Sequence, residues 1–362
     1  MSEVHQAFQI FSTQVLQGDS GIFFSDRRIN EHSKFYMGTG DYDLVSFADD
    51  IYPKYSVFDW KGEQSYHYAF EHNYTNGELD LTPSQEIDLS SDLDEILKWV
   101  MPNKVATQWQ EKIEKVIAAQ KNGEAWVLNL AHDFVSGMYE ETTNIKEICC
   151  QLFWRFLQID KGHCACLVFT NEQIFCSFSP ELFIRQEKDV LITSPIKGTG
   201  TIEYLRNSKK EESELDMVTD LLRNDLGQVC NLVEVIERRF LRAEKNFYSA
   251  RSLIQATLAT TFTQAYPQLL PAGSISGAPK QRVVEIIESL ENFDRGFYTG
   301  TMGVQLSPDD SVWNILIRTL FIDPAERTWS FPVGVGVTAE SDPLAEWQET
   351  LEKVSLLTDL QS

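Results

Sequence analysis

Basic residues, paired cysteines and long apolar runs are scarce in this sequence, and each shortage excludes a class of protein. The chain has 31 lysines and arginines against 54 aspartates and glutamates, a net charge of -23 at pH 7. Such a surface repels phosphate backbones and anionic lipids, so neither nucleic acid nor a membrane is an expected partner. No apolar run reaches the roughly 18 residues of a membrane helix, and residues 1–17 lack the pattern of a signal peptide. We therefore expect a cytoplasmic protein.

The cysteines and glycines lack the spacing of common cofactor sites. None of the six cysteines forms a C-x-x-C pair, so we expect no structural zinc and predict buried, reduced thiols. Gly198-Thr-Gly200 and Gly334-Val-Gly336 lack the third glycine and the following helix of a dinucleotide site. What the sequence does have is 43% hydrophobic and 12% aromatic residues, which is enough for a large core.

Strand-like and helix-like patterns occur in separate blocks. Short strands are expected within residues 1–80, then in the runs 164–170, 173–177, 182–185 and 190–196, spaced like an antiparallel meander, and later in 297–306, 312–322 and 328–338. Helical spacing covers 109–117, 215–226, 247–261, 279–290 and the segment from 342 onward. This segregation predicts an α+β fold.

Two pairs of acidic residues, each spanning one helical turn, are the first candidates for chemistry. Glu346 and Glu349 share a helix face with Lys353, and Glu211 and Glu214 have the same spacing on another helix. One interpretation is a solvated face with an ion pair. The other is a site for a hard cation such as magnesium, which prefers oxygen ligands. The spacing leaves both open.

Three further segments could bind an anion. Small residues from Ser274 to Lys280 precede a helix start, which fits either an anion site or an ordinary helix cap. Arg318 lies in an apolar run and needs an anionic partner, either a structural carboxylate or a ligand. Lys197 ends a strand-like run, where it is either an exposed turn residue or a functional one.

Taken together, the segments from Trp109 to the C-terminus resemble the chorismate-utilising enzyme family. The matching motifs are Ser179-Pro-Glu181, Pro195-Ile-Lys-Gly-Thr199, Glu214-x-x-Met217, Asp220-Leu-Leu-Arg-Asn-Asp-Leu-Gly227, Ser276-Gly-Ala-Pro-Lys280, Ile317-Arg-Thr319, Ser341-Asp-Pro343, Glu346-Trp-Gln-Glu-Thr350 and Lys353. The resemblance implies large antiparallel sheets in a sandwich flanked by helices. It also implies a β-rich N-terminal subregion, 1–108, and a chorismate-binding catalytic region, 109–362, intertwined as one domain.

The resemblance also implies the roles of individual residues. Glu214 and Glu349 would be direct Mg²⁺ ligands, with Glu211 and Glu346 in support, and the ion would hold the ring carboxylate of chorismate. Glu181 would be the general acid that protonates the departing ring hydroxyl. Arg318 and the backbone at Gly334 and Gly336 would hold the enolpyruvyl carboxylate, with Tyr298 nearby. Lys353 and Thr199 would also line the substrate pocket.

Two positions indicate the branch of the family. Val127 stands where isochorismate and salicylate synthases carry the lysine that activates water, so water attack is disfavoured. Lys197 stands where anthranilate synthases carry alanine and aminodeoxychorismate synthases carry a lysine nucleophile. The sequence thus resembles aminodeoxychorismate synthase component I, the synthase subunit for 4-aminobenzoate and folate synthesis. Ser252 replaces a common family histidine, expected on a helix.

The same branch implies ammonia as the second substrate, supplied from glutamine by a partner amidotransferase subunit. Residues 160–164 replace the proline-rich segment that helps bind tryptophan in anthranilate synthases, so we expect no tryptophan control. Anthranilate synthase component I is the main alternative, and a non-catalytic chorismate-binding paralogue is an alternative of another class.

Overall fold

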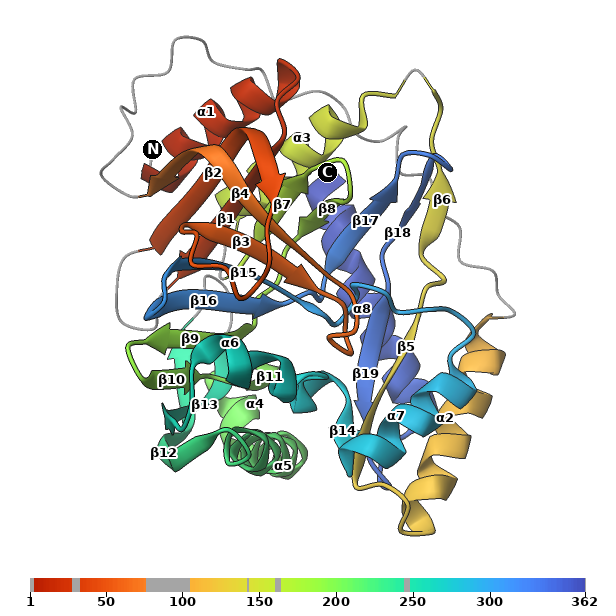
Figure 1. The fold of residues 1–362 in the computed structure, drawn as a ribbon. Coiled ribbons are helices and arrows are strands. Elements are labelled where there is room, and N and C mark those ends of the chain that lie inside the picture. Colours follow the sequence, from red (N-terminus) through yellow and green to blue (C-terminus); the bar gives the residue numbers. More distant parts are fainter. Residues whose placement is uncertain are drawn as a thin grey trace.

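The strands of the protein form one large antiparallel sheet and one small sheet (Figure 1). The computed structural model describes residues 3–27, 33–75, 105–141, 143–159, 164–243 and 248–361. Along the large sheet the strands follow one another as β11 (Ile196–Gly200), β13 (Tyr248–Leu258), β10 (Val190–Thr193), β9 (Leu182–Glu187), β16 (Asp310–Ile315), β15 (Thr301–Ser307), β3 (Lys54–Phe58), β4 (Ser65–Thr75), β2 (Ser33–Leu44), β1 (Gly21–Arg27), β7 (Cys166–Phe169), β8 (Ile174–Ser177), β17 (Thr319–Asp323), β18 (Thr328–Ser330) and β6 (Ser136–Met138).

A further strand, β12 (Cys230–Ala243), pairs with β13 outside this path. The small sheet has the order β14 (Gly277–Ala278), β5 (Val127–His132) and β19 (Val333–Val337). Eight α-helices of the described segments and two 3-10 turns lie around the sheets: α1 (Glu3–Leu16), α2 (Val105–Lys121), α3 (Ile145–Ile159), α4 (Ile202–Asn207), α5 (Lys209–Leu226), α6 (Phe262–Ala265), η1 (Tyr266–Leu269), η2 (Gly273–Ile275), α7 (Lys280–Leu290) and α8 (Pro343–Gln361). The predicted α+β fold, large antiparallel sheets flanked by helices, is confirmed.

The N-terminal strands are internal to the large sheet. β3 pairs with β15, and β1 pairs with β7, so all four strands before residue 76 lie between strands from later in the chain. The division at 108/109 stays a prediction, and residues 76–104, which include the end of the first expected block of strands, lie outside the described residues. No described helix has the combination of length and apolar character needed to cross a membrane. All six cysteines are buried and free, as expected.

Helix α1 was not predicted. The turn signals of the first 80 residues obscured its apolar face, in which Phe8, Phe11 and Val15 recur at helical spacing and are fully buried. The helix packs on α3, with the rings of Phe8 and Phe153 5.1 Å apart. Tertiary packing of these aromatic side chains therefore stabilises the helix, although the local sequence of residues 3–16 does not clearly favour one.

Four other predictions about elements were wrong. The run 328–338 is not one strand, because its first part, β18, belongs to the large sheet and its second part, β19, to the small one. The run 247–261 is not a helix: its described part forms β13, which pairs with β10 on one side and with β12 on the other. The expected meander is two separate hairpins, because β8 pairs with β17 whereas β9 pairs with β16. The run 312–322 is two strands, interrupted at Arg318, whose φ of 51° is left-handed and ends regular pairing.

Two helices bring the candidate residues together. Helix α5 begins after its N-cap Ser208 and buries Leu215, Val218 and Leu222 against the large sheet near β13, which turns its acidic first turns outward. Helix α8 begins at Pro343 and contacts β19, α2 and α3 as it runs past the small sheet toward the C-terminus (Figure 1). The edge strand β11 contacts α5 and carries Lys197 and Thr199, and the edge strand β19 contacts α8 and carries Gly334 and Gly336.

Candidate active site

Lys197 lies where the edges of the two sheets meet. It belongs to β11, and a Cβ added at Gly336 of β19 would lie 3.6 Å from Lys197 Nζ and 3.4 Å from Asn129 Oδ1. The absence of a side chain at Gly336 therefore leaves room above the lysine amine. Asn129, on the neighbouring strand β5, is held by a hydrogen bond from its Nδ2 to the carbonyl oxygen of Ser274, 3.1 Å away. Asn129 was not predicted as a site residue.

Gly334, two residues earlier on β19, adjoins Tyr298. An added Cβ at Gly334 would lie 3.1 Å from the Tyr298 hydroxyl and 2.8 Å from the carbonyl oxygen of Leu130, which is too close for any side chain. Tyr298 is 3% exposed. Burial raises the pKa of its phenol well above the ordinary value, with the Glu291 carboxylate adding to the increase and the Arg295 guanidinium opposing it, so the hydroxyl keeps its proton.

Glu181 precedes β9 and faces Lys197. Burial raises the pKa of its carboxyl group, whereas the Lys197 ammonium, a hydrogen bond with Ser274 and the charges of Arg251 and Lys353 lower it, and burial dominates. The local structure fixes this position, because the carbonyl oxygen of Glu181 accepts a hydrogen bond from the N–H of Ile315. A raised pKa suits a group that must hold a proton until the substrate is bound.

The four predicted metal-site glutamates lie on the facing turns of α5 and α8. Burial raises the pKa of Glu214, an effect that Lys197 and Lys210 oppose and that Glu211 and Glu349 reinforce. Burial likewise raises the pKa of Glu346, which is 1% exposed. Both acidic pairs thus share one electrostatic neighbourhood.

Glu349 differs from its neighbours. Burial alone would raise its pKa, but the ammonium of Lys353, with Lys197 and Lys210, holds it below the ordinary value. Lys353 Nζ lies 2.8 Å from Glu349 Oε1 and donates a hydrogen bond to the carbonyl oxygen of Gly334 at 2.7 Å. Lys353 therefore links the acidic cluster to β19, the strand that carries Gly334 and Gly336.

Gly198 brings the acidic cluster close to β11. Its φ of +77° is left-handed, and an added Cβ would lie 2.6 Å from Glu211 Oε2, so only glycine fits here. Glu211 Oε1 in turn accepts a hydrogen bond from the Tyr204 hydroxyl at 3.1 Å. Because Gly198 has no side chain, the Glu211 carboxylate can lie against β11 at the residue next to Lys197.

The donor chemistry of this cluster fits magnesium. It offers four carboxylates, Glu211, Glu214, Glu346 and Glu349, beside three ammonium groups, Lys197, Lys210 and Lys353. Glu346 Oε2 is buried and has no hydrogen-bond partner within the described part of the chain, which leaves one oxygen ligand unused. Among the described residues, however, no three His, Cys, Asp or Glu side chains converge closely enough to hold an ion. Magnesium therefore stays a prediction.

Arg318 and Thr199 are placed by their backbones. The carbonyl oxygen of Arg318 accepts a hydrogen bond from Phe178 N at 3.0 Å, next to the segment that ends in Glu181, and the arginine is half-buried rather than fully buried as expected. Thr199 lies in β11, opposite Ser249 of β13. Their predicted contacts with substrate stay predictions.

Val127 and Ser252, which stand where other family members carry a different residue, both lie in the packed interior. Val127 is buried in β5, opposite Ala278 of β14. Ser252 is fully buried in β13, not on a helix, and its hydroxyl accepts a hydrogen bond from Thr219 of α5 at 3.0 Å. Ser252 thus links α5 to the sheet, while the neighbouring Arg251 is one of three residues whose charges act on Glu181.

Sequence reasoning missed a buried ion pair behind the site. Arg295 and Glu291 have side chains 1% and 2% exposed, with Arg295 Nη2 2.6 Å from Glu291 Oε1. Arg295 also donates to the carbonyl oxygens of Asn129 and Ile275, at 2.7 and 3.1 Å. These contacts fix β5 and η2 relative to the loop before Tyr298. Glu291 and Arg295 are only four residues apart, but the backbone partners Asn129 and Ile275 lie 166 and 20 residues from Arg295, so no local pattern signals this set of contacts.

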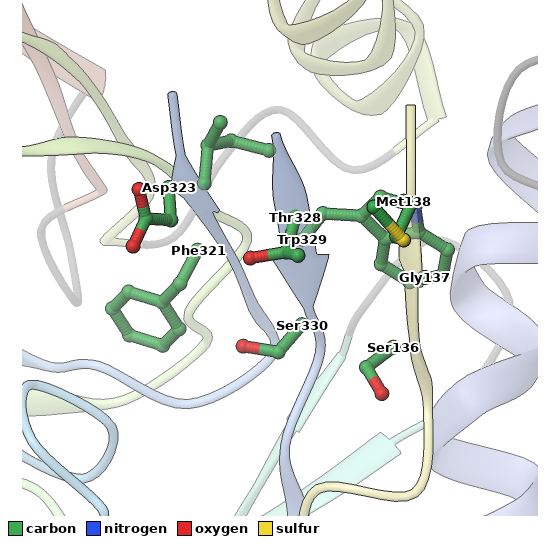
Figure 2. A pocket seen from close by; sticks show the side chains of 9 residues that line it. Ser136, Gly137, Met138, Phe321, Asp323, Thr328, Trp329 and Ser330 are labelled. Carbon is green, nitrogen blue, oxygen red and sulfur yellow. The ribbon is translucent and has the colours of Figure 1, made fainter. Parts of the chain in front are cut away.

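The segment from Ser274 to Lys280 makes two contacts with acidic residues. Ser274 contacts Glu181, and Lys280 Nζ lies 3.0 Å from Asp225 Oδ1. Elsewhere, a hollow of about 460 Å³ opens at the β6 edge of the large sheet (Figure 2) and contains none of the candidate residues; it is lined by Ser136, Gly137, Met138, Phe321, Ile322, Asp323, Thr328, Trp329 and Ser330.

Comparison with known proteins agrees with this geometry. The model of the chorismate binding enzyme family matches residues 71–359. The chain is 32% identical to a putative aminodeoxychorismate synthase of Schizosaccharomyces pombe, over 57% of this chain and 30% of that protein. It is 38% identical to an anthranilate synthase component 1 of Haloarcula marismortui, over 50% of this chain and 39% of that protein. The matches thus span less than half of either relative.

The fold itself matches solved structures over its whole length. The menaquinone-specific isochorismate synthase of Escherichia coli superposes with a TM-score of 0.74, covering 100% of this chain and 92% of that one, at 16% sequence identity. Identity at this level shows the fold alone.

Proposed function

Because the chain belongs to the family of chorismate binding enzymes, we propose that it replaces the ring hydroxyl of chorismate with an amino group and so forms 4-amino-4-deoxychorismate. The observation that carries this proposal is the placement of Lys197 Nζ beside Gly336 and facing Glu181. An amine and a carboxyl group of raised pKa whose charges act on one another could serve the same small substrate as nucleophile and general acid.

In the first step the Lys197 amine forms a bond to C2 of the ring. The two conjugated double bonds shift by one position each, and the C4 hydroxyl leaves as water with the proton of Glu181. The carboxylate of Glu181 then takes the proton that the new secondary ammonium releases. The result is a covalent adduct of chorismate less one water.

In the second step ammonia forms a bond to C4 and loses a proton. The double bonds shift back and the bond between C2 and the lysine nitrogen breaks as Glu181 gives its proton to that nitrogen, so that Lys197 regains its amine. The Glu181 carboxylate then takes the proton released by the new ammonium at C4. A glutamine amidotransferase subunit is proposed as the ammonia source. No net oxidation occurs, and the overall exchange is ammonia for water.

Substrate binding is proposed to use charge on both sides of the ring. Magnesium held by Glu214 and Glu349, supported by Glu211 and Glu346, would neutralise the ring carboxylate. Arg318, Tyr298 and the β19 backbone would hold the enolpyruvyl carboxylate. Chorismate is a dianion, and without the metal it would meet four carboxylates with only three ammonium groups among them.

Product analysis tests the proposal directly. The protein is incubated with chorismate, magnesium and ammonium, with and without an added aminodeoxychorismate lyase, and the products are identified by mass spectrometry. The proposal predicts aminodeoxychorismate, and 4-aminobenzoate only when the lyase is present. Anthranilate, which is fluorescent, is the product expected of the second candidate, favoured by the identity to an anthranilate synthase component. Its formation as the main product would overturn the assignment.

A further inference from the structure

Lys210 occupies an unusual place in the acidic cluster. It lies in the first turn of α5, whose N-cap is Ser208. An ammonium group there opposes the helix dipole, which favours acidic residues at this end, so helix stability does not account for it. Its neighbours Glu211 and Glu212 have the favoured sign. The position of Lys210 has to be explained by what its side chain contacts.

The side chain of Lys210 bridges the two helices that carry the proposed metal ligands. Its Nζ lies 3.8 Å from Glu214 Oε1 of α5 and 3.3 Å from Glu346 Oε1 of α8. Glu346 is 1% exposed, whereas the Lys210 side chain is 50% exposed. The carboxylate is therefore fixed in the protein, and the ammonium can move into solvent on its flexible four-carbon stem.

We propose that Lys210 is a built-in counter-ion that competes with magnesium for the acidic cluster and sets its metal affinity. Magnesium binds carboxylate oxygens at about 2.1 Å, so an ion on Glu214 and an ammonium still on Glu346 would be neighbours of like charge. The ion has to displace the ammonium. Without metal, Lys210 compensates the buried charge of Glu346 and keeps α5 and α8 together.

The inference rests on the proposed magnesium requirement, so its test measures metal binding rather than turnover. The test compares four proteins: wild type, Lys210→Met, Lys210→Arg and the control Lys209→Met. Each is dialysed against a chelator and titrated with Mg²⁺ by calorimetry, and electron paramagnetic resonance of Mn²⁺ is the second probe. Lys209 is the exposed residue immediately before Lys210 and has the same charge.

Lys210→Met is expected to bind Mg²⁺ about tenfold more tightly than wild type, because a competing charge is gone. Lys210→Arg keeps the charge and should stay near wild type, as should Lys209→Met. In chelator the melting temperature of Lys210→Met should fall, and Mg²⁺ should raise it by more than it raises that of wild type, since the buried Glu346 has lost its counter-charge.

Two outcomes would overturn the inference in distinguishable ways. Equal Mg²⁺ affinities of Lys210→Met and wild type would show that Lys210 does not compete, while the metal assignment stands. No binding by any variant, wild type included, would remove the metal site itself. Lys210→Gln repeats the comparison with a polar side chain, so that a folding defect of the methionine variant does not decide the result.

Discussion

Lys353 donates a hydrogen bond from its Nζ to the carbonyl oxygen of Gly334, 2.7 Å away, and so ties α8 to the edge strand of the small sheet. The same ammonium lies 2.8 Å from Glu349 Oε1. Lys353→Met should therefore lower kcat/KM for chorismate about 10- to 100-fold, because charge-assisted hydrogen bonds contribute about 1.5–3 kcal/mol. Steady-state kinetics and the melting temperature measure the effect.

The control for this prediction is Lys353→Arg, which keeps the charge but changes its shape. It should retain more activity than the methionine variant. If both variants had wild-type kcat/KM, the hydrogen bond between α8 and β19 would not be part of the active site.

The Gly336→Ala variant should lose activity and still fold. The added Cβ would lie at ordinary contact distances, 3.4 Å from Asn129 Oδ1 and 3.6 Å from Lys197 Nζ, so the variant should fold. It would fill space proposed for substrate, and one extra methyl group in a pocket reduces kcat/KM about 10- to 200-fold.

Gly334→Ala is the matched comparison, because its Cβ would lie 2.8 Å from the carbonyl oxygen of Leu130. This variant should lose thermal stability as well as activity. Wild-type activity in Gly336→Ala would exclude chorismate from the space above Lys197.

Glu214→Gln and Glu349→Gln should each reduce turnover by about 100-fold or more while the fold persists, since a formal charge is removed with little change of shape. The control is Glu352→Gln, an exposed residue on the same helix as Glu349. Chorismate affinity in the wild type should also fall in a chelator. Equal affinity with chelator and with magnesium, or full activity of both site variants, would contradict the metal assignment.

The buried His132 should make the folded protein less stable in mild acid. Burial, with the Lys112 and Lys353 ammonium groups, lowers its pKa from 6.5 to about 3. Because the folded pKa lies below the unfolded value, the stabilisation is present above pH 6.5 and is lost as the pH falls toward 3. At a pH about 2 units below the unfolded pKa, this amounts to roughly 2–3 kcal/mol.

Denaturant unfolding at a series of pH values tests this. His132→Phe, which suits a ring stacked 4.4 Å from Phe134, should flatten the acid limb of the stability profile. His72→Gln, at an exposed histidine, should leave that limb as it is in the wild type. An unchanged acid limb in His132→Phe would contradict the prediction.

The sequence predicted the parts of the site that local spacing or a motif encodes. The one-turn spacing of Glu346 and Glu349 places both on one face of α8. The motif around Lys197 identified this residue as a candidate, but Lys197 lies within β11 and not at the end of the preceding strand β10. Lys210 was missed although it precedes Glu214 by four residues, because its second partner, Glu346, comes from a helix more than a hundred residues later. Such a contact depends on the packing of α5 and α8.

The wrong elements have a similar cause. The apolar residues around Ile254 fit helical spacing and strand alternation about equally, and only pairing with both β10 and β12 decides for a strand. For α1, the buried positions Phe8 and Phe11 follow helical spacing, but Phe153, which packs against Phe8, lies on α3. Long-range partners, not local propensity, determine these segments.

The central claim is that Lys197 bonds covalently to the substrate ring. The enzyme is incubated with chorismate and magnesium in the absence of ammonia and glutamine, quenched and digested, and the peptides are analysed by mass spectrometry. The account predicts an adduct of chorismate less one water on the peptide that contains Lys197. Added ammonium should discharge the adduct, and Lys197→Ala should form none while still binding chorismate. Wild-type rates of aminodeoxychorismate formation by Lys197→Ala would contradict the account and favour direct attack by ammonia.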